Sequence, residues 1–170
     1  MQNIRPTNPL REQVLGTPDA ILAQFDHLES QARLILSTPE IFALRHVFLT
    51  GCGDSQIAAA SVEMAFEQFS GIPVEALRAM EASRYALPAL STHASATLVV
   101  AISSSGTVAR TAEAIEVARR LGTKTIALTS KPESPVGQAA GTILQMESAS
   151  LPSAPGFYGY ILSIVALNLL

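Results

Sequence analysis

Thr97-Leu98-Val99-Val100-Ala101-Ile102-Ser103-Ser104-Ser105-Gly106-Thr107 is the stretch of sequence that predicts the fold. Its first six residues are apolar at nearly every position, as a strand must be when both of its faces are covered. A hydroxyl-rich loop follows, and apolar side chains at helical spacing come next, at Val108, Ala112, Ile115 and Ala118. A buried strand, a loop and a helix in this order are the unit of a parallel sheet wrapped by helices.

Four more short apolar runs alternate with stretches of helical period. They span residues 46–50, 73–77, 124–128 and 141–146. After the first run, one helical face carries Ala58, Val62, Ala65 and Phe69, and Gly71 is expected to end that helix. The pattern predicts a three-layer α/β/α sandwich around a parallel, flavodoxin-like sheet, in which the strand at 97–102 is central.

A further helix is expected ahead of the sheet. Thr17 is a typical N-cap residue and Pro18 suits the first helical position, so the helix is predicted from Pro18 to about Leu36. Residues 1–16 are then expected to be an N-terminal arm, and residues 17–45 a leading helical segment. The helix has an apolar stripe suited to docking on the domain or on a second subunit, formed by Ile21, Leu22, Phe25, Leu28, Ala32 and Ile35.

Composition and charge narrow the classes of partner. The chain has 170 residues, of which 48% are hydrophobic and 15% charged, and this predicts about one core-rich domain. Its net charge of -3 offers no basic surface for a nucleic-acid backbone or an anionic membrane. The single cysteine, Cys52, excludes an intrachain disulfide and a multi-cysteine zinc site. We expect a cytoplasmic protein with no metal and no cofactor.

The loop at residues 103–107 is the stronger candidate ligand site. In parallel sheets, ligands bind where the carboxyl ends of strands meet helix N-termini. The hydroxyl groups of Ser103, Ser104, Ser105 and Thr107 can bind phosphate oxygens, while Gly106 lets the backbone approach closely or take a positive φ. The alternative is that these residues only turn the chain and cap the helix.

A second loop, Gly51-Cys52-Gly53-Asp54-Ser55-Gln56, follows the first predicted strand. Gln56 stands where a dinucleotide fingerprint needs its third glycine, and Ser55 is not flanked as in a nucleophile elbow, so both motifs are excluded. Cys52 at a helix N-terminus could be a nucleophile, but a small buried residue in a tight turn is the favoured interpretation. Asp54 and Ser55 are interpreted as helix-capping groups that also touch the hydroxyls of a ligand.

The G-C-G-x-S and S-x-S-G-x loops, with Glu81-Ala82-Ser83-Arg84-Tyr85 between them, resemble the SIS (sugar isomerase) domain family from about Leu10 to Leu170. This family includes the isomerase half of glucosamine-6-phosphate synthase and the related tagatose-6-phosphate and fructosamine-type proteins. The resemblance implies that residues 46–170 form a first SIS repeat that binds a phosphorylated sugar or amino sugar.

On the family's motif, Ser103, Ser104 and Ser105 fall on phosphate-binding positions, and Gly53 and Ser55 fall on sugar-contacting positions. Val108 departs from the family's usual threonine, a role that Thr107 could take over. The segment 151–156 departs from a glutamate and V-A-S-T-K-like run that lines the sugar in similar proteins. The full predicted binding set is Cys52, Gly53, Ser55, Ser103, Ser104, Ser105, Gly106, Thr107 and Val108.

The catalytic groups are the least determined part of the prediction. Sugar isomerisation needs a base near the carbon and an acid for ring opening. The resemblance implies that these groups lie largely in a second SIS repeat and a C-terminal tail. Glu81 and Glu147 are weak candidates in this chain, and solvated surface acids are the favoured interpretation of both.

We therefore expect the first half of a sugar-phosphate isomerase or deaminase, cut before its second repeat and dimeric through the leading helix and the helix at 158–170. Whether the chain itself is an enzyme stays open. The first alternative is a non-catalytic sugar-phosphate sensor. The second is a flavodoxin-like flavin domain, against which stand the position of the hydroxyl loop after the third strand and the lack of tryptophan.

Overall fold

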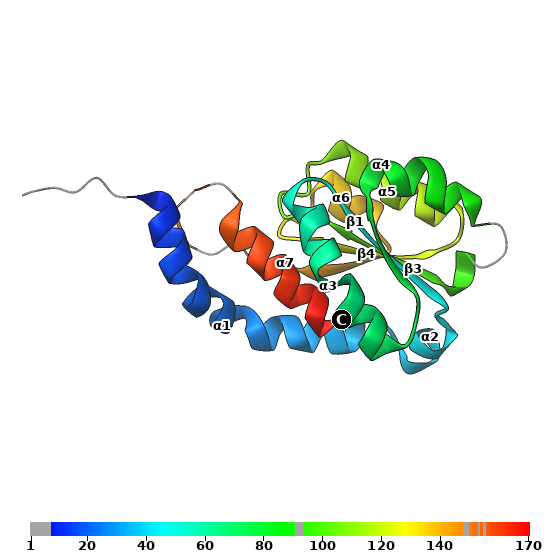
Figure 1. Cartoon of the computed structure of the whole chain (residues 1–170), viewed down its shortest axis with the longest axis horizontal. Coiled ribbons are helices and arrows are strands. Elements are labelled where there is room, and N and C mark those ends of the chain that lie inside the picture. The colour runs from blue at the N-terminus through cyan, green and yellow to red at the C-terminus, as the bar shows by residue number, and fades with distance from the viewer. Residues whose placement is uncertain (1–7, 91–93, 148–149, 153, 155) are drawn as a thin grey trace, which may run out of the picture.

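A sheet of five parallel strands forms the centre of the computed structural model, which describes residues 8–90, 94–147, 150–152, 154 and 156–170 (Figure 1). The strands lie in the order β2-β1-β3-β4-β5. Their bounds are His46–Gly51 for β1, Val74–Arg78 for β2, Thr97–Ile102 for β3, Lys124–Thr129 for β4 and Thr142–Gln145 for β5. The predicted parallel sheet with a central strand at 97–102 is confirmed.

β3 lies in the middle because its side chains suit burial on both faces. All six of its residues are buried. Leu98, Val100 and Ile102 pack into one core, and Val99 and Ala101 pack into cores on the opposite face. Because successive side chains of a strand point to opposite faces of the sheet, β3 packs against helices on both faces.

Helices cover both faces of the sheet and complete the predicted sandwich (Figure 1). One layer consists of α1 (Pro9–Ile35), α3 (Asp54–Ser70) and α7 (Phe157–Leu169). The other consists of α4 (Ala79–Glu81), α5 (Ala109–Arg120), α6 (Pro135–Ala139) and the π-helical turn Ala82–Ala86. The connecting elements are α2 (Thr38–Ala43) and the 3-10 turns Leu87–Ala89 and Ala94–Ala96.

The chain changes its direction of winding between β1 and β3. It passes from β1 to α3 on one face, and from β3 to α5 on the other. Gly51 and Ile102, the last residues of the two strands, are register partners, so the loops that follow begin at the same level. Such a switch point leaves a crevice at the carboxyl ends of the strands.

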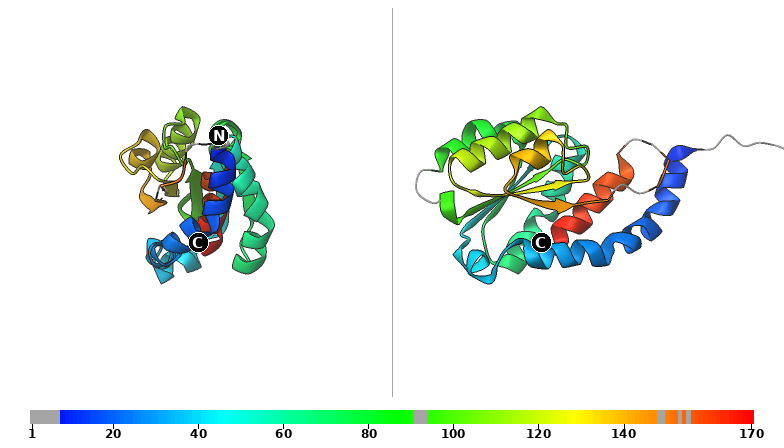
Figure 2. Two further views of the ribbon diagram at one scale, coloured as in Figure 1. Left: turned by 90° about the vertical axis from the view of Figure 1, so that its left-hand side faces the viewer. Right: turned by 180° about the vertical axis from the view of Figure 1, so that it is seen from behind.

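The predicted start of the leading helix is wrong, because α1 begins at Pro9 instead of Pro18. Asn8 and Pro9 repeat the cap-and-proline pattern of Thr17 and Pro18, and the side chain of Asn8 accepts a hydrogen bond from the first turn at 3.2 Å. Pro18 is then inside the helix. A proline there removes one backbone hydrogen bond and bends the helix. α1 is visibly bent in Figure 1 and in the right-hand view of Figure 2, and it contacts α7.

The predicted apolar stripe of α1 is only partly buried. Leu28 is fully buried, but Leu22 is 72% exposed and Phe25 is 39% exposed. The buried residues of α1 are instead mostly polar: Gln13, Thr17, Gln24 and Leu28. The earlier helix start does not change which residues share a face of the helix. The difference arises because this face meets backbone groups of the sheet edge as well as apolar side chains.

The buried face of α3 is also shorter than the apolar pattern of its sequence predicts. Ala58 and Val62 are buried as expected, and the left-handed Gly71 ends the helix as expected. Phe69 is 88% exposed, and Phe66 packs against the core in its place.

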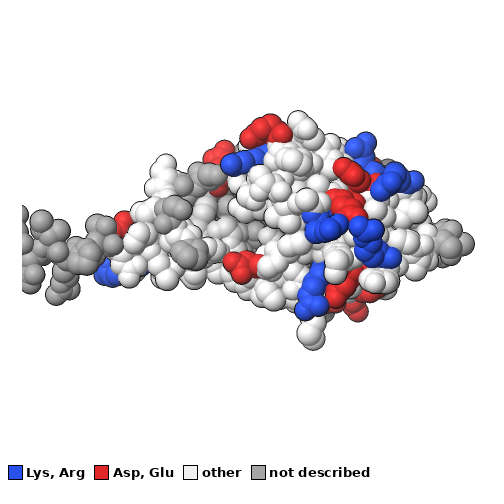
Figure 3. All heavy atoms as spheres, turned by 90° about the horizontal axis from the view of Figure 1, so that it is seen from above, with Lys and Arg blue, Asp and Glu red and all other residues white. Residues whose placement is uncertain are grey.

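Charged side chains of both signs are interleaved on the face over α5 (Figure 3). Glu113 lies between two arginines there, 2.5 Å from Arg84 and 2.6 Å from Arg110. This pairing leaves no large field of one sign on the face. Within the described residues, no helix combines the length and apolar character needed to cross a membrane.

Candidate functional site

A cavity of about 530 Å³ lies at the carboxyl ends of the strands, at the switch point between β1 and β3. Loops after β1, β3, β4 and β5 line it, together with α1 and α7. Of the residues predicted from the sequence, the lining includes Cys52, Ser55, Ser103, Ser104, Ser105, Val108 and Glu147. Gly53, Gly106 and Thr107 lie in the same two loops but are not lining residues.

The loop of residues 103–107, named the serine loop here, has three of its backbone carbonyl groups hydrogen-bonded within the protein. The carbonyl of Ser104 accepts hydrogen bonds from the N–H of Ser130 at 3.2 Å and from its hydroxyl at 2.6 Å. The carbonyl of Gly106 accepts from the N–H of Val136 at 3.1 Å. Ser103, Ser104 and Ser105 of this loop line the cavity.

The hydroxyl of Ser103 is buried without a hydrogen-bond partner among the described residues. Ser103 is 3% exposed and lines the cavity. A buried polar group left unpaired costs about 1–3 kcal/mol. A ligand oxygen in the cavity could supply the bond, and the hydroxyls of Ser105 and Thr107, 3.0 Å apart, lie in the same loop.

Three helices, α3, α5 and α7, begin at the cavity with an N-cap residue that makes no side-chain cap. α5 starts after Val108 and α3 starts after Gly53, and neither residue caps its helix with a side-chain hydrogen bond. Asn8 on α1 and Ser134 on α6 do so. The first-turn N–H groups of α5 carry the positive end of the helix dipole, which favours an anion.

Charged residues in the lining are of both signs: Asp54, Lys131 and Glu147. The exposed carboxylate of Glu147 lies 4.0 Å from the imidazole of His27. Glu81 is not brought to the cavity, because it pairs with Arg78 at 3.0 Å at the start of α4. Of the two acids considered from the sequence, only Glu147 is next to the site.

Cys52 is half-buried in the cavity wall, and Thr111 Oγ1 donates a hydrogen bond to its Sγ at 3.8 Å. Among the lining residues that the structure describes there is no histidine to act as its base. The surroundings favour a small packing residue over a nucleophile.

The first turn of α7 packs close to the serine loop. A methyl group added at Gly159 would lie 3.2 Å from Ser104 Oγ, so glycine permits this approach. Tyr158 is buried beside it, and burial raises the pKa of its phenol. A hydrogen bond from Gln24 works in the opposite direction on that pKa, and the charge of Glu147 adds to the rise.

Several lining residues were not predicted. Ser130 and Lys131 follow β4, and their position at the carboxyl end of a strand was a signal that could have found them. Gln13 comes from the segment expected to be an arm, and the first turn of α7 lies far along the chain. Of the departure at 151–156, Leu151, Pro152, Ala154 and Gly156 line the cavity, while residues 153 and 155 lie outside the described part.

Among curated proteins, the chain is similar to the glutamine–fructose-6-phosphate aminotransferase (isomerizing) of Symbiobacterium thermophilum. The two are 33% identical over 161 residues, which cover 95% of this chain and 25% of the relative. The chain therefore spans about a quarter of the length of that relative.

Two solved structures show the same fold at low sequence identity. The tagatose-6-phosphate ketose/aldose isomerase of Escherichia coli matches with a TM-score of 0.76 and 16% identity, over 97% of this chain and 49% of that one. The Vibrio vulnificus NanR protein, solved with ManNAc-6P, matches with a TM-score of 0.64 and 18% identity, over 90% of this chain and 58% of that one.

A family model for the SIS domain matches residues 40–170, which include the whole sheet and both loops of the site. The resemblance inferred from the two loops is thereby confirmed, and the chain belongs to the SIS domain family.

Proposed function

We propose that the chain binds a phosphorylated sugar in this cavity, with the phosphate on the serine loop and the N-terminus of α5. The buried hydroxyl of Ser103, which lacks a partner among the described residues, carries the proposal. Hydroxyl donors, N–H groups and a helix dipole can share the charge of a phosphate without an arginine. The tagatose-6-phosphate isomerase and the NanR complex with ManNAc-6P support this class of ligand.

Calorimetric titration with fructose 6-phosphate, glucosamine 6-phosphate and unphosphorylated fructose tests the proposal. We expect binding of a phosphate ester and none of fructose. Ser103→Ala and Ser105→Ala should each weaken binding by about 10-fold or more, because a hydrogen bond to a charged group is lost. Ser30→Ala, an exposed serine on α1, should leave the affinity unchanged. Equal binding of fructose and its phosphate ester would refute the proposal.

In the whole protein, we propose that this site serves a sugar-phosphate isomerase or an amino-sugar-phosphate deaminase. Glu147 lies two residues after the end of β5 and lines the cavity, where its carboxylate could move a proton at a sugar carbon. Exchange of the C2 proton of the sugar followed by NMR tests this role. Glu147→Gln should retain binding and lose exchange. A whole protein that binds the sugar phosphate but never exchanges its protons would instead be a sensor.

A second SIS unit and a homodimer are proposed to complete the assembly. The chain spans 49% of the tagatose-6-phosphate isomerase, which leaves room for a second unit of similar size. Apolar side chains are exposed on α1 at Leu15 and Leu22 and on α3 at Met64 and Phe69. Monomeric mass in light scattering at high protein concentration would refute the homodimer. We also propose a cytoplasmic location, in keeping with the single cysteine, and cell fractionation tests it.

A further inference from the structure

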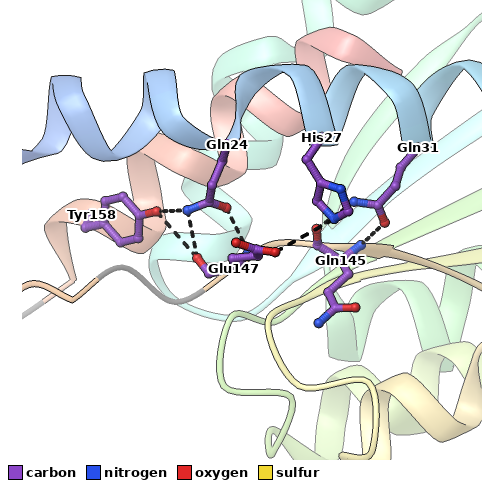
Figure 4. A network of polar contacts seen from close by, with 6 residues as sticks. All are labelled: Gln24, His27, Gln31, Gln145, Glu147 and Tyr158. Carbon is purple, nitrogen blue, oxygen red and sulfur yellow. Dashed lines mark hydrogen bonds and ion pairs between the residues drawn. The ribbon is translucent and has the colours of Figure 1, made fainter.

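Glutamine side chains of α1 bind the backbone of the sheet's open edge and of the cavity wall (Figure 4). β5 is an edge strand, so its outer N–H and C=O groups have no neighbouring strand. Gln31 fills this role for Gln145: its Oε1 accepts from the N–H at 3.0 Å and its Nε2 donates to the carbonyl at 3.1 Å. A side-chain amide thus reproduces the pairing that a further strand would make.

Gln24 repeats the arrangement about two helical turns earlier, at Glu147. Its Oε1 accepts from the N–H of Glu147 at 2.8 Å, and its Nε2 donates to the carbonyl of Glu147 at 3.0 Å. The same Nε2 also donates to the hydroxyl of Tyr158 in the first turn of α7. Gln24 is 5% exposed, so these bonds are made away from solvent.

Gln13, which lies nearer the N-terminus of α1, also binds backbone groups with its side-chain amide. Its Oε1 accepts from the N–H of Tyr158 at 3.2 Å, and its Nε2 donates to the carbonyl of Pro152 at 3.1 Å. It therefore satisfies a first-turn N–H of α7, a helix whose own N-cap residue, Gly156, makes no side-chain cap.

The glutamines differ in what they hold. Gln24 and Gln13 bind residues that line the cavity, namely Glu147, Pro152 and Tyr158. Gln31 binds Gln145, which does not line it. Gln24 and Gln31 each form the same pair of hydrogen bonds with the backbone of one residue, so the paired bonds are matched. The two residues differ in that Gln24 binds a lining residue, also donates to Tyr158 and is more buried.

We propose that Gln24 is a positioning residue, which fixes the cavity wall at Glu147 and Tyr158 and thereby sets the affinity for the sugar part of the ligand. This inference rests on the proposed binding of a sugar phosphate. It assigns to α1 a function in the site, although Gln24 itself is not a lining residue. The serine loop, which is proposed to hold the phosphate part of the ligand, is hydrogen-bonded to Ser130 and Val136 and only approached by α7 at Gly159, so Gln24 should affect the phosphate part little.

The test compares Gln24→Met with the matched control Gln31→Met. Methionine has a similar length and volume and cannot form the paired bonds. Fructose 6-phosphate and inorganic phosphate are the calorimetric probes. We expect fructose 6-phosphate to bind Gln24→Met about 10-fold more weakly and Gln31→Met within about twofold of the wild type. Inorganic phosphate should bind both variants as it binds the wild type.

Amide hydrogen exchange of the unliganded proteins supplies a readout that does not depend on the ligand. Gln24→Met should speed exchange at Glu147 and in the first turn of α7, and Gln31→Met should speed it at Gln145 alone. Unchanged exchange at Glu147 in Gln24→Met, or an equal loss of fructose 6-phosphate affinity in both variants, would overturn the inference. A wild type that binds neither probe would refute the proposed function, and the exchange comparison would still decide whether Gln24 holds the wall.

Discussion

Replacing Gly106 with alanine tests whether backbone conformation and close packing hold the serine loop in place. Gly106 has a φ of +68°, and a Cβ there would overlap Ser134 Oγ and lie 3.0 Å from Thr129 Oγ1. Gly71→Ala is the matched control, because Gly71 has a φ of +67° and no atom within 4 Å of an added Cβ. The two variants share the cost of a left-handed alanine and differ in crowding.

The expected magnitudes follow from these two terms. A left-handed conformation costs a residue with a Cβ about 1–2 kcal/mol, and we expect this loss of unfolding free energy for Gly71→Ala. Gly106→Ala must also displace the hydroxyl of Ser134, which caps α6 through the N–H of Gly137 at 3.3 Å. Loss of that cap adds about 1 kcal/mol, so the total for Gly106→Ala is about 2–3 kcal/mol.

Urea unfolding followed by circular dichroism measures both losses, and each kcal/mol should lower the Tm by about 2–4 °C in a chain of this size. Calorimetric titration with fructose 6-phosphate should show weaker binding by Gly106→Ala and unchanged binding by Gly71→Ala. Equal destabilisation of the two variants would refute the reasoning, because it would mean that Ser134 moves aside at no cost.

Three further predictions concern groups outside the serine loop. Burial raises the pKa of the Tyr158 phenol above its usual value of 10.0, so the protonated phenol stabilises the fold below pH 10.0 and this contribution is lost as the pH rises further. The unfolding free energy of Tyr158→Phe should therefore depend less on pH in alkaline solution. Hydrogen bonds from Lys124 and then from the Ser37 backbone lower the pKa of Glu40 from 4.5 to about 2. The stabilising effect of the carboxylate is therefore present above pH 4.5 and is lost as the pH falls towards 2. In Glu40→Gln, the unfolding free energy should change less with pH over this acidic range. Leu28→Ala, at a residue of α1 that is 0% exposed, should cost about 2–5 kcal/mol in urea unfolding, whereas Leu22→Ala, at 72% exposure, should stay within about 0.5 kcal/mol.

The sheet was predictable because its signal is local. The run at 97–102 carries its burial in its own composition, and the observed β3 has the same bounds. The ends of the other predicted strands agree with those observed to within one residue. Short apolar runs followed by polar loops suffice to define parallel strands, since every strand in such a sheet is covered by helices.

The leading helix was less predictable because its sequence contains two adequate starting points. Asn8-Pro9 and Thr17-Pro18 both place a capping side chain before a proline, and the structure uses the first. The earlier start brings Gln13 into the helix, where its side chain binds the backbone of Pro152 and Tyr158, more than a hundred residues away. No local pattern in residues 9–17 contains that contact.

The candidate site also has one part that could be predicted from the sequence and one part that could not. The serine loop was predicted because hydroxyls, glycine and a helix start are neighbours in the chain. The wall formed by α7 was missed because its place depends on buried glutamines of α1, and a glutamine inside a helical pattern is usually assigned to the exposed face. Gln24 and Gln13 are buried because the open edge of β5 and the start of α7 present backbone groups that need partners.

Capping chemistry connects the fold to the proposed function. At the starts of α1 and α6, the side-chain oxygens of Asn8 and Ser134 accept hydrogen bonds from first-turn N–H groups. Where α5 begins at the cavity, Val108 supplies no such oxygen, although an N-cap hydroxyl would add about 1 kcal/mol of stability. The uncapped start of α5 lies beside the buried hydroxyl of Ser103, and this arrangement is in keeping with the proposed phosphate site. The departure of Val108 from the family's usual threonine removes a side-chain donor, and it also leaves the N–H groups of α5 without a competing acceptor.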